Sequence, residues 1–318
     1  MSFGEQFLVH PDLFPARRSG ETWGERELVI DLPGGPYLFT GLNAGQEAHV
    51  RRRFGSFCGL GAGSPPAVET RFFRAAEADF REIDTRGWEY GLDLDFGLAA
   101  VRVAGLRLMA RLDWRPGLAA AVWTPDAGGE AFAGIFENAF RALVSYRLLE
   151  SGGVVLHGAA LARRQEGGGA FLFLGRSGAG KSTVSRLGME RGLTVLSDDL
   201  NALLPGELPG AAVATVAAAT AVVKLPFTGD VGEPGAPSPP HPLRALFRLE
   251  KSAEEAVSPL SRAEVVGCLL ACSPFLNTDP YRRETLVSIL SALVPRSLPA
   301  YALRFSLTGR FWELPELA

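Results

Sequence analysis

One stretch of the sequence, AFLFLGRSGAGKST at residues 170–183, constrains the fold more than any other. Its first five residues are apolar without interruption, which is typical of a short buried strand. The residues that follow match the pattern of Gly, four residues, Gly-Lys, and Ser or Thr. The defining positions are occupied by Gly175, Gly180, Lys181 and Ser182. This pattern is typical of a turn that wraps phosphate groups.

A short helix is predicted directly after this turn. Three apolar residues recur there among polar ones: Val184, Leu187 and Met189. We expect the helix to begin at Thr183 and to stop at Gly192, a common C-terminal residue. Strand, glycine-rich turn and helix in this order are the context that phosphate binding requires. We therefore expect a nucleotide site at residues 175–182, called the glycine loop below.

Each residue type in the glycine loop has a predicted role. Glycines adopt backbone angles that other residues avoid, so successive N–H groups turn toward phosphate oxygens. We expect the Lys181 ammonium to contact the β and γ phosphates and the Ser182 hydroxyl to ligate Mg²⁺. The cofactors predicted are ATP and Mg²⁺. The residues predicted to bind them are Gly175, Ser177, Gly178, Ala179, Gly180, Lys181, Ser182 and Thr183.

Polar residues that end two neighbouring apolar runs are predicted to complete the site. His157 ends the run VVLH before the glycine loop, and Asp198 and Asp199 end LTVLS after it. Phosphoryl transfer needs a metal ligand and a carboxylate that deprotonates the acceptor hydroxyl. Two aspartates divide these roles, although the residues alone do not say which takes which. A structural role, such as capping the next element, stays open for one aspartate and for His157.

The composition is that of a globular protein with an ample core. Of the 318 residues, 47% are hydrophobic and 21% charged, and the formal net charge is -3. This balance favours neither a nucleic-acid nor a membrane partner. The N-terminus lacks the basic start and apolar core of a signal peptide. We therefore expect a soluble, cytoplasmic protein.

The three cysteines are too few for a disulfide framework. Cys268 and Cys272 lie four residues apart in the apolar run VVGCLLACS. A metal site would need further ligands, and none stand nearby in the sequence. We therefore expect two small buried side chains on one face of a helix.

Two domains are predicted, 1–129 and 130–318, in a mixed α/β (α+β) fold class. The first shows short apolar runs broken by turns, typical of a strand-rich accessory domain. Residues 130–150 carry the strongest helical pattern, and we expect this helix at the seam between the halves. In the second domain we expect a strand pair before the glycine loop. Further strands and helices are predicted at 193–199, 218–226, 241–252, 261–273, 281–294 and 300–307. The Pro- and Gly-rich segment 228–243 is predicted to be irregular until the strand resumes.

Three motifs, LHGAAL, GRSGAGKST and RGLTVLSDDL, together resemble the catalytic domain of HPr kinase/phosphorylase. They are still more similar to the broader group of HPr-kinase-related serine kinases, whose core resembles that of phosphoenolpyruvate carboxykinase. The later segment LPFTGD and the N-terminal segment YLFTGLNAGQEAHVRRRFGSF also look like parts of that group. The resemblance implies a C-terminal HPr-kinase-like domain, and it is compatible with a homo-oligomer.

The resemblance also assigns roles to the site residues. Asp199 matches the proton acceptor of the family, which leaves Asp198 as the supporting carboxylate and, with Ser182, a metal ligand. His157 and Lys181 would lie beside them in the active site. The sequence lacks the Glu-Ile-Arg-Gly-x-Gly stretch that carries a metal-ligating Glu in HPr kinases. This absence argues against HPr as the acceptor and against a reverse, phosphorolytic reaction.

The leading hypothesis is thus an ATP-dependent kinase that phosphorylates a hydroxyl group of a protein or peptide, with Ser as the expected acceptor residue. A second hypothesis is a metabolite kinase on the same scaffold. A third is a non-catalytic nucleotide-binding regulator, against which the intact Asp-Asp pair argues. A carboxykinase is the weakest, because its substrate-side arginines and metal ligands are not found.

Overall fold

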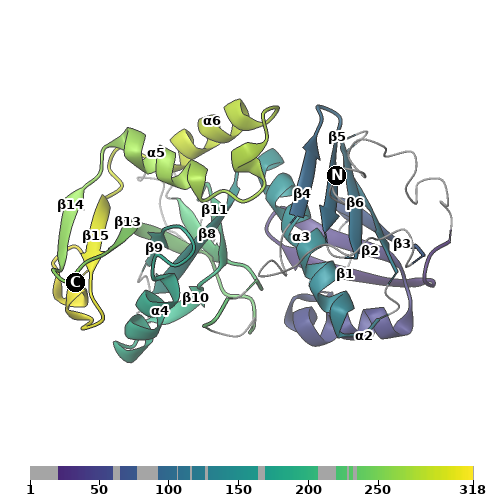
Figure 1. Cartoon of the computed structure of the whole chain (residues 1–318), viewed down its shortest axis with the longest axis horizontal. Helices are drawn as coiled ribbons and strands as arrows, with labels where there is room; N and C mark the ends of the chain where they lie inside the picture. The colour runs from purple at the N-terminus through teal and green to yellow at the C-terminus, as the bar shows by residue number, and fades with distance from the viewer. Residues whose placement is uncertain are drawn as a thin grey trace. The chain divides into compact units, whose positions relative to one another are not determined.

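A computed structural model describes residues 21–59, 65–76, 92–105, 107–114, 117–125, 128–163, 169–206, 220–227, 229–231 and 235–317. The chain divides into two compact units, each with its own sheet (Figure 1). Unit 1 comprises Met1–Arg147 and Asp279–Tyr281, and unit 2 comprises Leu148–Thr278 and Arg282–Ala318. The predicted mixed α+β class is confirmed.

Unit 1 is built on a seven-stranded sheet in the order β1-β2-β3-β7-β6-β5-β4. The strands are β1 (Arg26–Leu32), β2 (Gly35–Leu42), β3 (Val68–Arg74), β4 (Leu92–Phe96), β5 (Ala100–Gly105), β6 (Leu108–Trp114) and β7 (Leu118–Thr124). β3 pairs with β2 and β7 in parallel, and the other neighbours are antiparallel. Helix α2 (Ala44–Phe54) begins at a capping box between Asn43 and Gln46, and the 3-10 turn η3 (Gly55–Phe57) follows it.

The long helix α3 (Glu130–Glu150) supplies the aromatic core of unit 1. Phe136 and Phe140 are buried, and their ring centroids lie 4.7 and 5.0 Å from that of Phe39 on β2. The predicted apolar side of the helix is confirmed, because Ile135, Phe136, Phe140, Leu143, Val144 and Leu148 are all buried. Since these rings pack on strands of unit 1, the units divide at 147/148, whereas the sequence suggested 129/130.

Unit 2 contains an eight-stranded sheet in the order β10-β8-β11-β12-β13-β15-β14, with β9 paired to β8 and β13. The strands are β8 (Val154–Ala162), β9 (Ala170–Leu174), β10 (Thr194–Ser197), β11 (Leu200–Leu204), β12 (Ala221–Lys224), β13 (His241–Lys251), β14 (Ala256–Pro259) and β15 (Ala300–Phe305). The helical elements are α4 (Lys181–Glu190), α5 (Arg262–Ala271), η5 (Leu276–Thr278), α6 (Arg283–Leu293) and η6 (Arg310–Glu313).

Strand β9, which leads into the glycine loop, is paired along both edges. It runs antiparallel to β8, as the predicted strand pair requires, and parallel to β13. All five of its residues are buried. Phe173 of β9 stacks on Phe247 of β13 with ring centroids 5.2 Å apart, and Trp312 packs edge-on against Phe173. The strand therefore holds the start of the loop on a rigid, fully packed support.

The predicted helices and strands of the second half are confirmed, and two strands, β11 and β14, were not predicted. The expected helix at 281–294 corresponds to α6, and the long strand after the Pro- and Gly-rich segment is β13. In that segment residues 228 and 232–234 lie outside the described residues, and 235–240 form no helix or strand. None of the described helices combines the length and apolar character needed to cross a bilayer.

Candidate functional site

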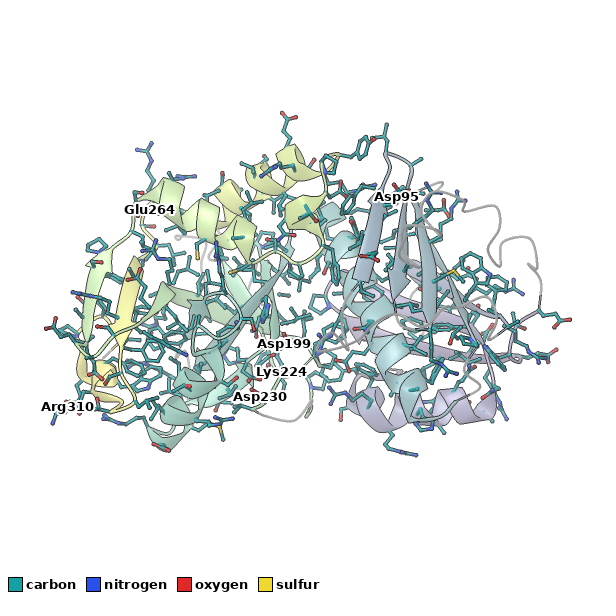
Figure 2. The ribbon with its side chains drawn as sticks, viewed as in Figure 1. Asp95, Asp199, Lys224, Asp230, Glu264 and Arg310 are labelled. Carbon is teal, nitrogen blue, oxygen red and sulfur yellow. The ribbon has the colours of Figure 1, made fainter. Side chains whose placement is uncertain are left out.

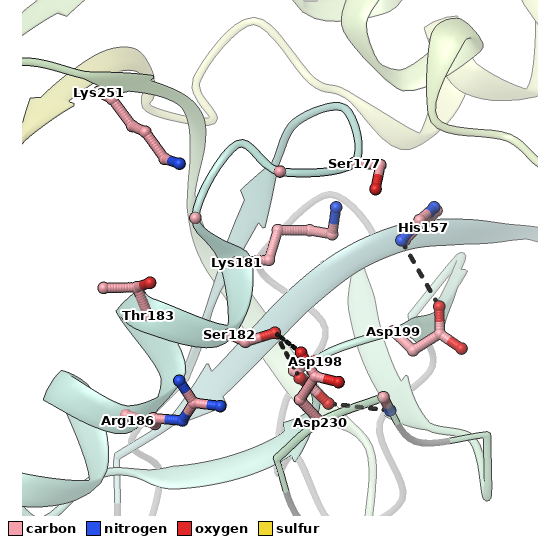
Figure 3. A pocket seen from close by; sticks show the side chains of 13 residues that line it. His157, Ser177, Lys181, Ser182, Thr183, Arg186, Asp198, Asp199, Asp230 and Lys251 are labelled. Atoms are coloured by element: carbon pink, nitrogen blue, oxygen red, sulfur yellow. Dashed lines mark hydrogen bonds and ion pairs between the residues drawn. The ribbon is translucent and has the colours of Figure 1, made fainter. Parts of the chain in front are cut away.

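The glycine loop opens onto a pocket of about 360 Å³ within unit 2 (Figure 3). Gly180 has a left-handed backbone (φ 105°) and is the N-cap of α4. The helix therefore begins at Lys181, two residues earlier than Thr183, because the left-handed glycine completes the turn before the lysine. Six predicted residues of the loop line the pocket: Ser177, Gly178, Gly180, Lys181, Ser182 and Thr183. The positive end of the α4 dipole lies at this pocket.

Gly175 and Ala179 are the two predicted binding residues that do not line the pocket. Gly175 instead accepts a hydrogen bond through its carbonyl oxygen from the Lys181 ammonium at 3.0 Å. Ala179 packs against the apolar core of unit 2. A Cβ on Gly175 would lie 2.6 Å from the Cβ of Ala179, so the start of the loop is too tight for a larger residue. These two positions shape the loop and do not face the pocket.

Lys181 is largely buried at the base of the pocket. Besides the Gly175 carbonyl, its ammonium donates to the carbonyl oxygen of Arg176 at 3.2 Å. Burial lowers the pKa of Lys181, and the negative groups of Cys272, Asp199 and Asp198 oppose that shift. The loop thus places the Lys181 ammonium among its own carbonyl oxygens. An anionic ligand interacts with a largely buried cation of this kind more strongly than with one at an open surface.

The two aspartates lie between β10 and β11, the two strands that pair one after the other with β8. β10 and β11 both pair with β8, Ser197 opposite Ala160 and Leu200 opposite His157. Asp198 and Asp199 form the bend between these two strands. Both face the pocket, although successive strand residues point to opposite sides, because the bend breaks the strand alternation. The predicted position at the end of a strand is therefore confirmed for both.

Asp198 is buried and firmly held. Its Oδ1 accepts from the backbone N–H of Gly229 at 3.0 Å, and its Oδ2 accepts from the N–H of Val231 at 3.1 Å. The Ser182 hydroxyl donates to the same Oδ2 at 3.0 Å. The carboxylate thus fixes the segment 229–231 against the start of α4. Ser182 and Asp198, the two residues predicted to ligate a metal, thus lie in direct contact.

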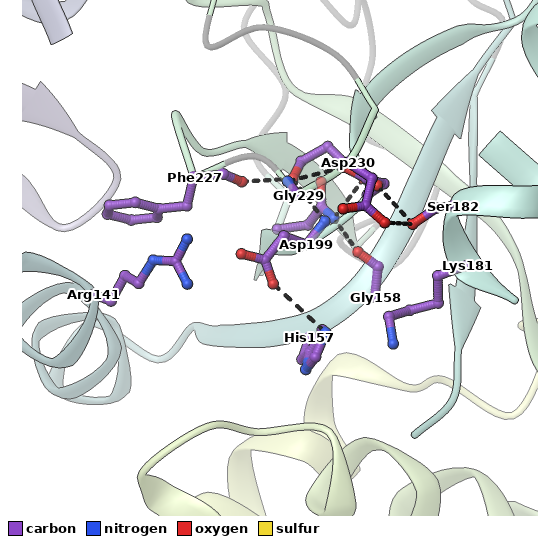
Figure 4. A network of polar contacts seen from close by, with 12 residues as sticks. Arg141, His157, Gly158, Lys181, Ser182, Asp199, Phe227, Gly229 and Asp230 are labelled. Carbon is purple, nitrogen blue, oxygen red and sulfur yellow. Dashed lines mark hydrogen bonds and ion pairs between the residues drawn. The ribbon is translucent and has the colours of Figure 1, made fainter. Parts of the chain in front are cut away.

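Asp230 is a site residue that the sequence reasoning did not identify. Its Oδ2 lies 3.2 Å from the Ser182 hydroxyl oxygen, and its side chain lines the pocket. Figure 2 labels Asp230 and Asp199 in the same region of unit 2, and Figure 4 shows the contact of Asp230 with Ser182. Asp230 is the last residue of LPFTGD, the segment noted for its family resemblance, and this was the available signal.

Asp199 faces His157 across the pocket. The His157 Nε2 and the Asp199 Oδ1 are 3.5 Å apart (Figure 4). The carboxylate is 17% exposed and the imidazole 42%, so both are reached from the pocket. The backbone N–H of Gly158 donates to the Asp199 carbonyl at 2.9 Å, which fixes the aspartate beside β8. His157 does not end its strand, because β8 continues to Ala162.

Two further cations line the pocket and were not predicted. Arg186 comes from the second turn of α4, and Lys251 is the last residue of β13 (Figure 3). Neither belongs to a sequence motif. Arg186 lies one turn after Ser182 on α4, whereas Lys251 reaches the pocket through the fold of the sheet. With Lys181, they bring three positive side chains to the pocket that the three aspartates also line.

The residues around Ser182 fit a small divalent cation. A hydroxyl has one proton to donate, yet two carboxylate oxygens lie within 3.2 Å of the Ser182 oxygen. Among the described residues, no three His, Cys, Asp or Glu side chains form a metal-binding cluster. Mg²⁺ characteristically takes one or two carboxylates and completes its shell with water and phosphate oxygens. Asp198, Asp230 and Ser182 match that set.

The fold and the site define a class of protein: two α+β units, of which the second carries a glycine loop, a His–Asp pair and two further aspartates around one pocket. Within that class the chain belongs to the family of the SynChlorMet cassette protein ScmC. The model of this family matches residues 137–317, which run from within α3 through unit 2. No curated protein matches the sequence.

Proposed function

We propose that the protein is an ATP- and Mg²⁺-dependent kinase. It transfers the γ-phosphate to a hydroxyl group of a protein or peptide, and Ser is the proposed acceptor residue. The observation that carries the proposal is the position of Asp199. Its carboxylate, 3.5 Å from His157, lines the same pocket as Lys181 and Ser182 of the glycine loop. A proton acceptor and a phosphate-binding loop in one pocket are the two parts that phosphoryl transfer to a hydroxyl requires.

The residues of the pocket divide the work of this reaction. The N–H groups at the start of α4 and the ammonium of Lys181 bind the phosphates of ATP. Ser182, Asp198 and Asp230 would hold the metal, which would neutralise charge on the transferred group. Asp199 takes the proton of the acceptor hydroxyl, while the hydroxyl oxygen bonds to the γ-phosphorus and ADP leaves. His157 orients the Asp199 carboxylate through their contact.

The class of acceptor rests on the resemblance of the three motifs to HPr-kinase-related serine kinases. The absence of the Glu-Ile-Arg-Gly-x-Gly stretch sets HPr itself and a phosphorylase reaction aside. Asp230 brings a second carboxylate to Ser182, with its Oδ2 3.2 Å from the hydroxyl oxygen. We also propose a cytoplasmic location, in keeping with the globular composition and the small net charge of the chain.

The first experiment compares wild type with Asp199→Asn, using γ-labelled ATP, Mg²⁺ and an extract of the source cells. We expect wild type to label a protein or peptide and the variant to lose at least about 100-fold of the transfer rate, the usual worth of a general base. Binding of a fluorescent ATP analogue should be retained in the variant, because Asp199 is not assigned to the phosphates. Transfer at the normal rate by the variant would contradict the assigned base.

The location of the label separates the remaining hypotheses. Label in a small molecule would identify a metabolite kinase. Binding of ATP by wild type without transfer to any acceptor would identify a nucleotide-dependent regulator and would contradict the proposed kinase.

A further inference from the structure

Lys251, the last residue of β13, lines the pocket but has no role in the reaction as described above. Alternate residues of this strand share a buried core with helix α4: Ala245, Phe247 and Leu249. Because side chains alternate along a strand, Lys251 continues this row on the same side of the sheet. The row is buried up to Leu249, and the exposed Lys251 carries it into the pocket.

Strand pairing holds Lys251 beside the glycine loop. β13 continues for three residues beyond its last pair with β9, in which Arg248 lies opposite Leu174. Lys251 itself is paired with Phe305 of β15. The ring of Phe305 lies so close to Gly180 that an added Cβ there would be 2.5 Å from its Cζ. The backbone of Lys251 is therefore fixed next to the start of α4.

The charge of Lys251 is not neutralised by a neighbouring side chain. Among the residues that the structure describes, no carboxylate forms an ion pair with its ammonium. The adjacent Glu250 alternates to the other side of the strand, where it forms an ion pair of 2.6 Å with Arg248. The ammonium of Lys251 is thus available to an anion in the pocket.

The two edges of β9 place different groups on the two sides of the glycine loop. One edge pairs with β8, which carries His157, and the aspartates lie between strands that pair with β8. The other edge pairs with β13, which carries Lys251. Figure 3 shows Lys251 and Asp199 on opposite sides of the loop. The pocket therefore has an acidic side, where the proposed transfer takes place, and a basic side away from it.

Helix α5 ends on the acidic side. Its C-cap is Cys272, whose carbonyl oxygen accepts a hydrogen bond of 2.7 Å from the backbone N–H of His157. Cys268 and Cys272 are both partly exposed, whereas the sequence suggested buried side chains. The end of α5 thus packs on β8 at this point, which leaves the β13 side for the rest of a bound nucleotide.

We propose that Lys251 binds the phosphates that stay on the leaving ADP and so fixes the direction in which ATP lies in the pocket. This inference rests on the proposed function. The γ-phosphate faces Asp199, because this carboxylate must reach the acceptor hydroxyl. The α- and β-phosphates extend from Lys181 toward β13, where the Lys251 ammonium donates a charge-assisted hydrogen bond to them.

The test is a competition titration of the full chain with Mg²⁺ and a fluorescent ATP analogue, in which ATP or ADP is the competitor. We expect Lys251→Gln to weaken ATP and ADP by the same factor of about ten, the usual worth of a hydrogen bond to a charged group. Lys251→Arg, which keeps the cation, should retain most of the affinity. Because the Lys251 side chain is exposed, both variants should keep the circular dichroism spectrum of wild type.

Arg304→Gln is the matched control, because it removes the same charge from β15, next to Phe305 but on the opposite face of the strand. It should leave both affinities unchanged. A loss in Arg304→Gln equal to that in Lys251→Gln would reduce the effect to net charge and overturn the proposal. Unchanged ADP affinity in Lys251→Gln would also overturn it, whether or not ATP binding is weakened.

The two proposals fail in different ways. If wild type binds neither ATP nor ADP, both the role of Lys251 and the proposed function are wrong. If wild type binds both nucleotides and Lys251→Gln shows the expected equal losses, but no acceptor is ever labelled, only the kinase activity is contradicted.

Discussion

At the scale of single residues, the hydroxyl of Ser182 is the point where the site is most constrained. It faces Asp198 at 3.0 Å and Asp230 at 3.2 Å, and it can donate its proton to only one of them at a time. Asp198 is compensated by two backbone N–H groups. A divalent cation placed among these oxygens would relieve the remaining repulsion, which makes Asp230 the residue most directly tied to metal affinity.

We predict that Asp230→Asn weakens binding of Mn²⁺, used as a probe for Mg²⁺, by about tenfold or more in the presence of an ATP analogue. The amide keeps the shape of the side chain and removes the negative charge that the cation requires. Electron paramagnetic resonance of free Mn²⁺ measures the affinity independently of turnover. Glu190→Gln, an exposed carboxylate at the end of α4, is the matched control and should leave it unchanged. Unchanged affinity in Asp230→Asn would contradict its role as a ligand.

Sequence reasoning identified the site residues that lie in continuous motifs. The glycine loop, His157 and the Asp198–Asp199 pair all stand within or next to apolar runs, so the strands that carry them follow from local pattern, although β8 continues past His157 to Ala162. Asp230 and Lys251 were missed because tertiary packing brings them to the pocket, whereas Arg186 lies one turn after Ser182 on α4 and carries no motif of its own. The different surroundings of the adjacent aspartates likewise depend on the N–H groups of residues 229 and 231, which lie 31 and 33 residues from Asp198 in the chain.

At the scale of elements, the junction between the glycine loop and α4 depends on Gly180. Its φ of 105° is unfavourable for any residue with a side chain, and an added Cβ would lie 2.5 Å from the Cζ of Phe305. Phe305 is the last residue of β15 and is buried in the core of unit 2. The loop is therefore held in shape both by its own backbone and by a strand far along the chain.

We predict that Gly180→Ala lowers the free energy of unfolding by about 1–3 kcal/mol and abolishes binding of the ATP analogue. The strained φ and the contact with Phe305 both displace the start of α4. Gly192→Ala is the control, because its φ is 81° but no atom lies within 4 Å of an added Cβ. Gly192→Ala should lower the free energy of unfolding by about 1–2 kcal/mol through backbone strain alone, and it should still bind the ATP analogue. Urea denaturation and fluorescence titration measure the two effects, and normal binding by Gly180→Ala would contradict the prediction.

The elements that the sequence predicted well are those with strong periodicity or clear stops. Helix α3 has a regular apolar face, and α4 is framed by two glycines. The strand β14 (AVSP) was missed because its residues, two half-buried and two exposed, form no apolar run, and the strand is defined by pairing with β15. Strand β11 was missed because the aspartate bend interrupts what is otherwise a continuous pairing with β8. Homo-oligomerisation and the absence of nucleic-acid partners stay predictions.

At the scale of the whole molecule, the chain enters unit 1 twice. Residues Asp279–Tyr281 belong to unit 1, although η5 before them and α6 after them belong to unit 2. Asp279 is fully buried, and its Oδ2 accepts a hydrogen bond of 3.1 Å from the hydroxyl of Tyr146 on α3. Its Oδ1 accepts from the backbone N–H of Tyr281 at 2.9 Å. A buried carboxylate thus anchors this short return of the chain.

We predict that Tyr146→Phe lowers the free energy of unfolding of unit 1 by about 1–3 kcal/mol, because a buried carboxylate loses a donor. Urea denaturation followed by circular dichroism measures the change. Tyr301→Phe is the control, since among the described residues the structure gives its hydroxyl no hydrogen-bond partner. It should change stability by less than about 0.5 kcal/mol. Equal effects of the two substitutions would show that the Asp279 contact contributes nothing.

The parallel pairing of β9 with β13 has a consequence for how the protein is made. On the ribosome, strand β9 and the glycine loop emerge long before β13 and β15. Leu243 of β13 pairs with Ala170 of β9, and Phe305 of β15 lies against Gly180. Non-local parallel pairs of this kind form slowly. The nascent loop therefore stays without its final packing until translation has passed residue 305. The pocket therefore has its final packing only on chains synthesised beyond residue 305, so a ligand of the pocket can stabilise the folded unit but cannot start its folding.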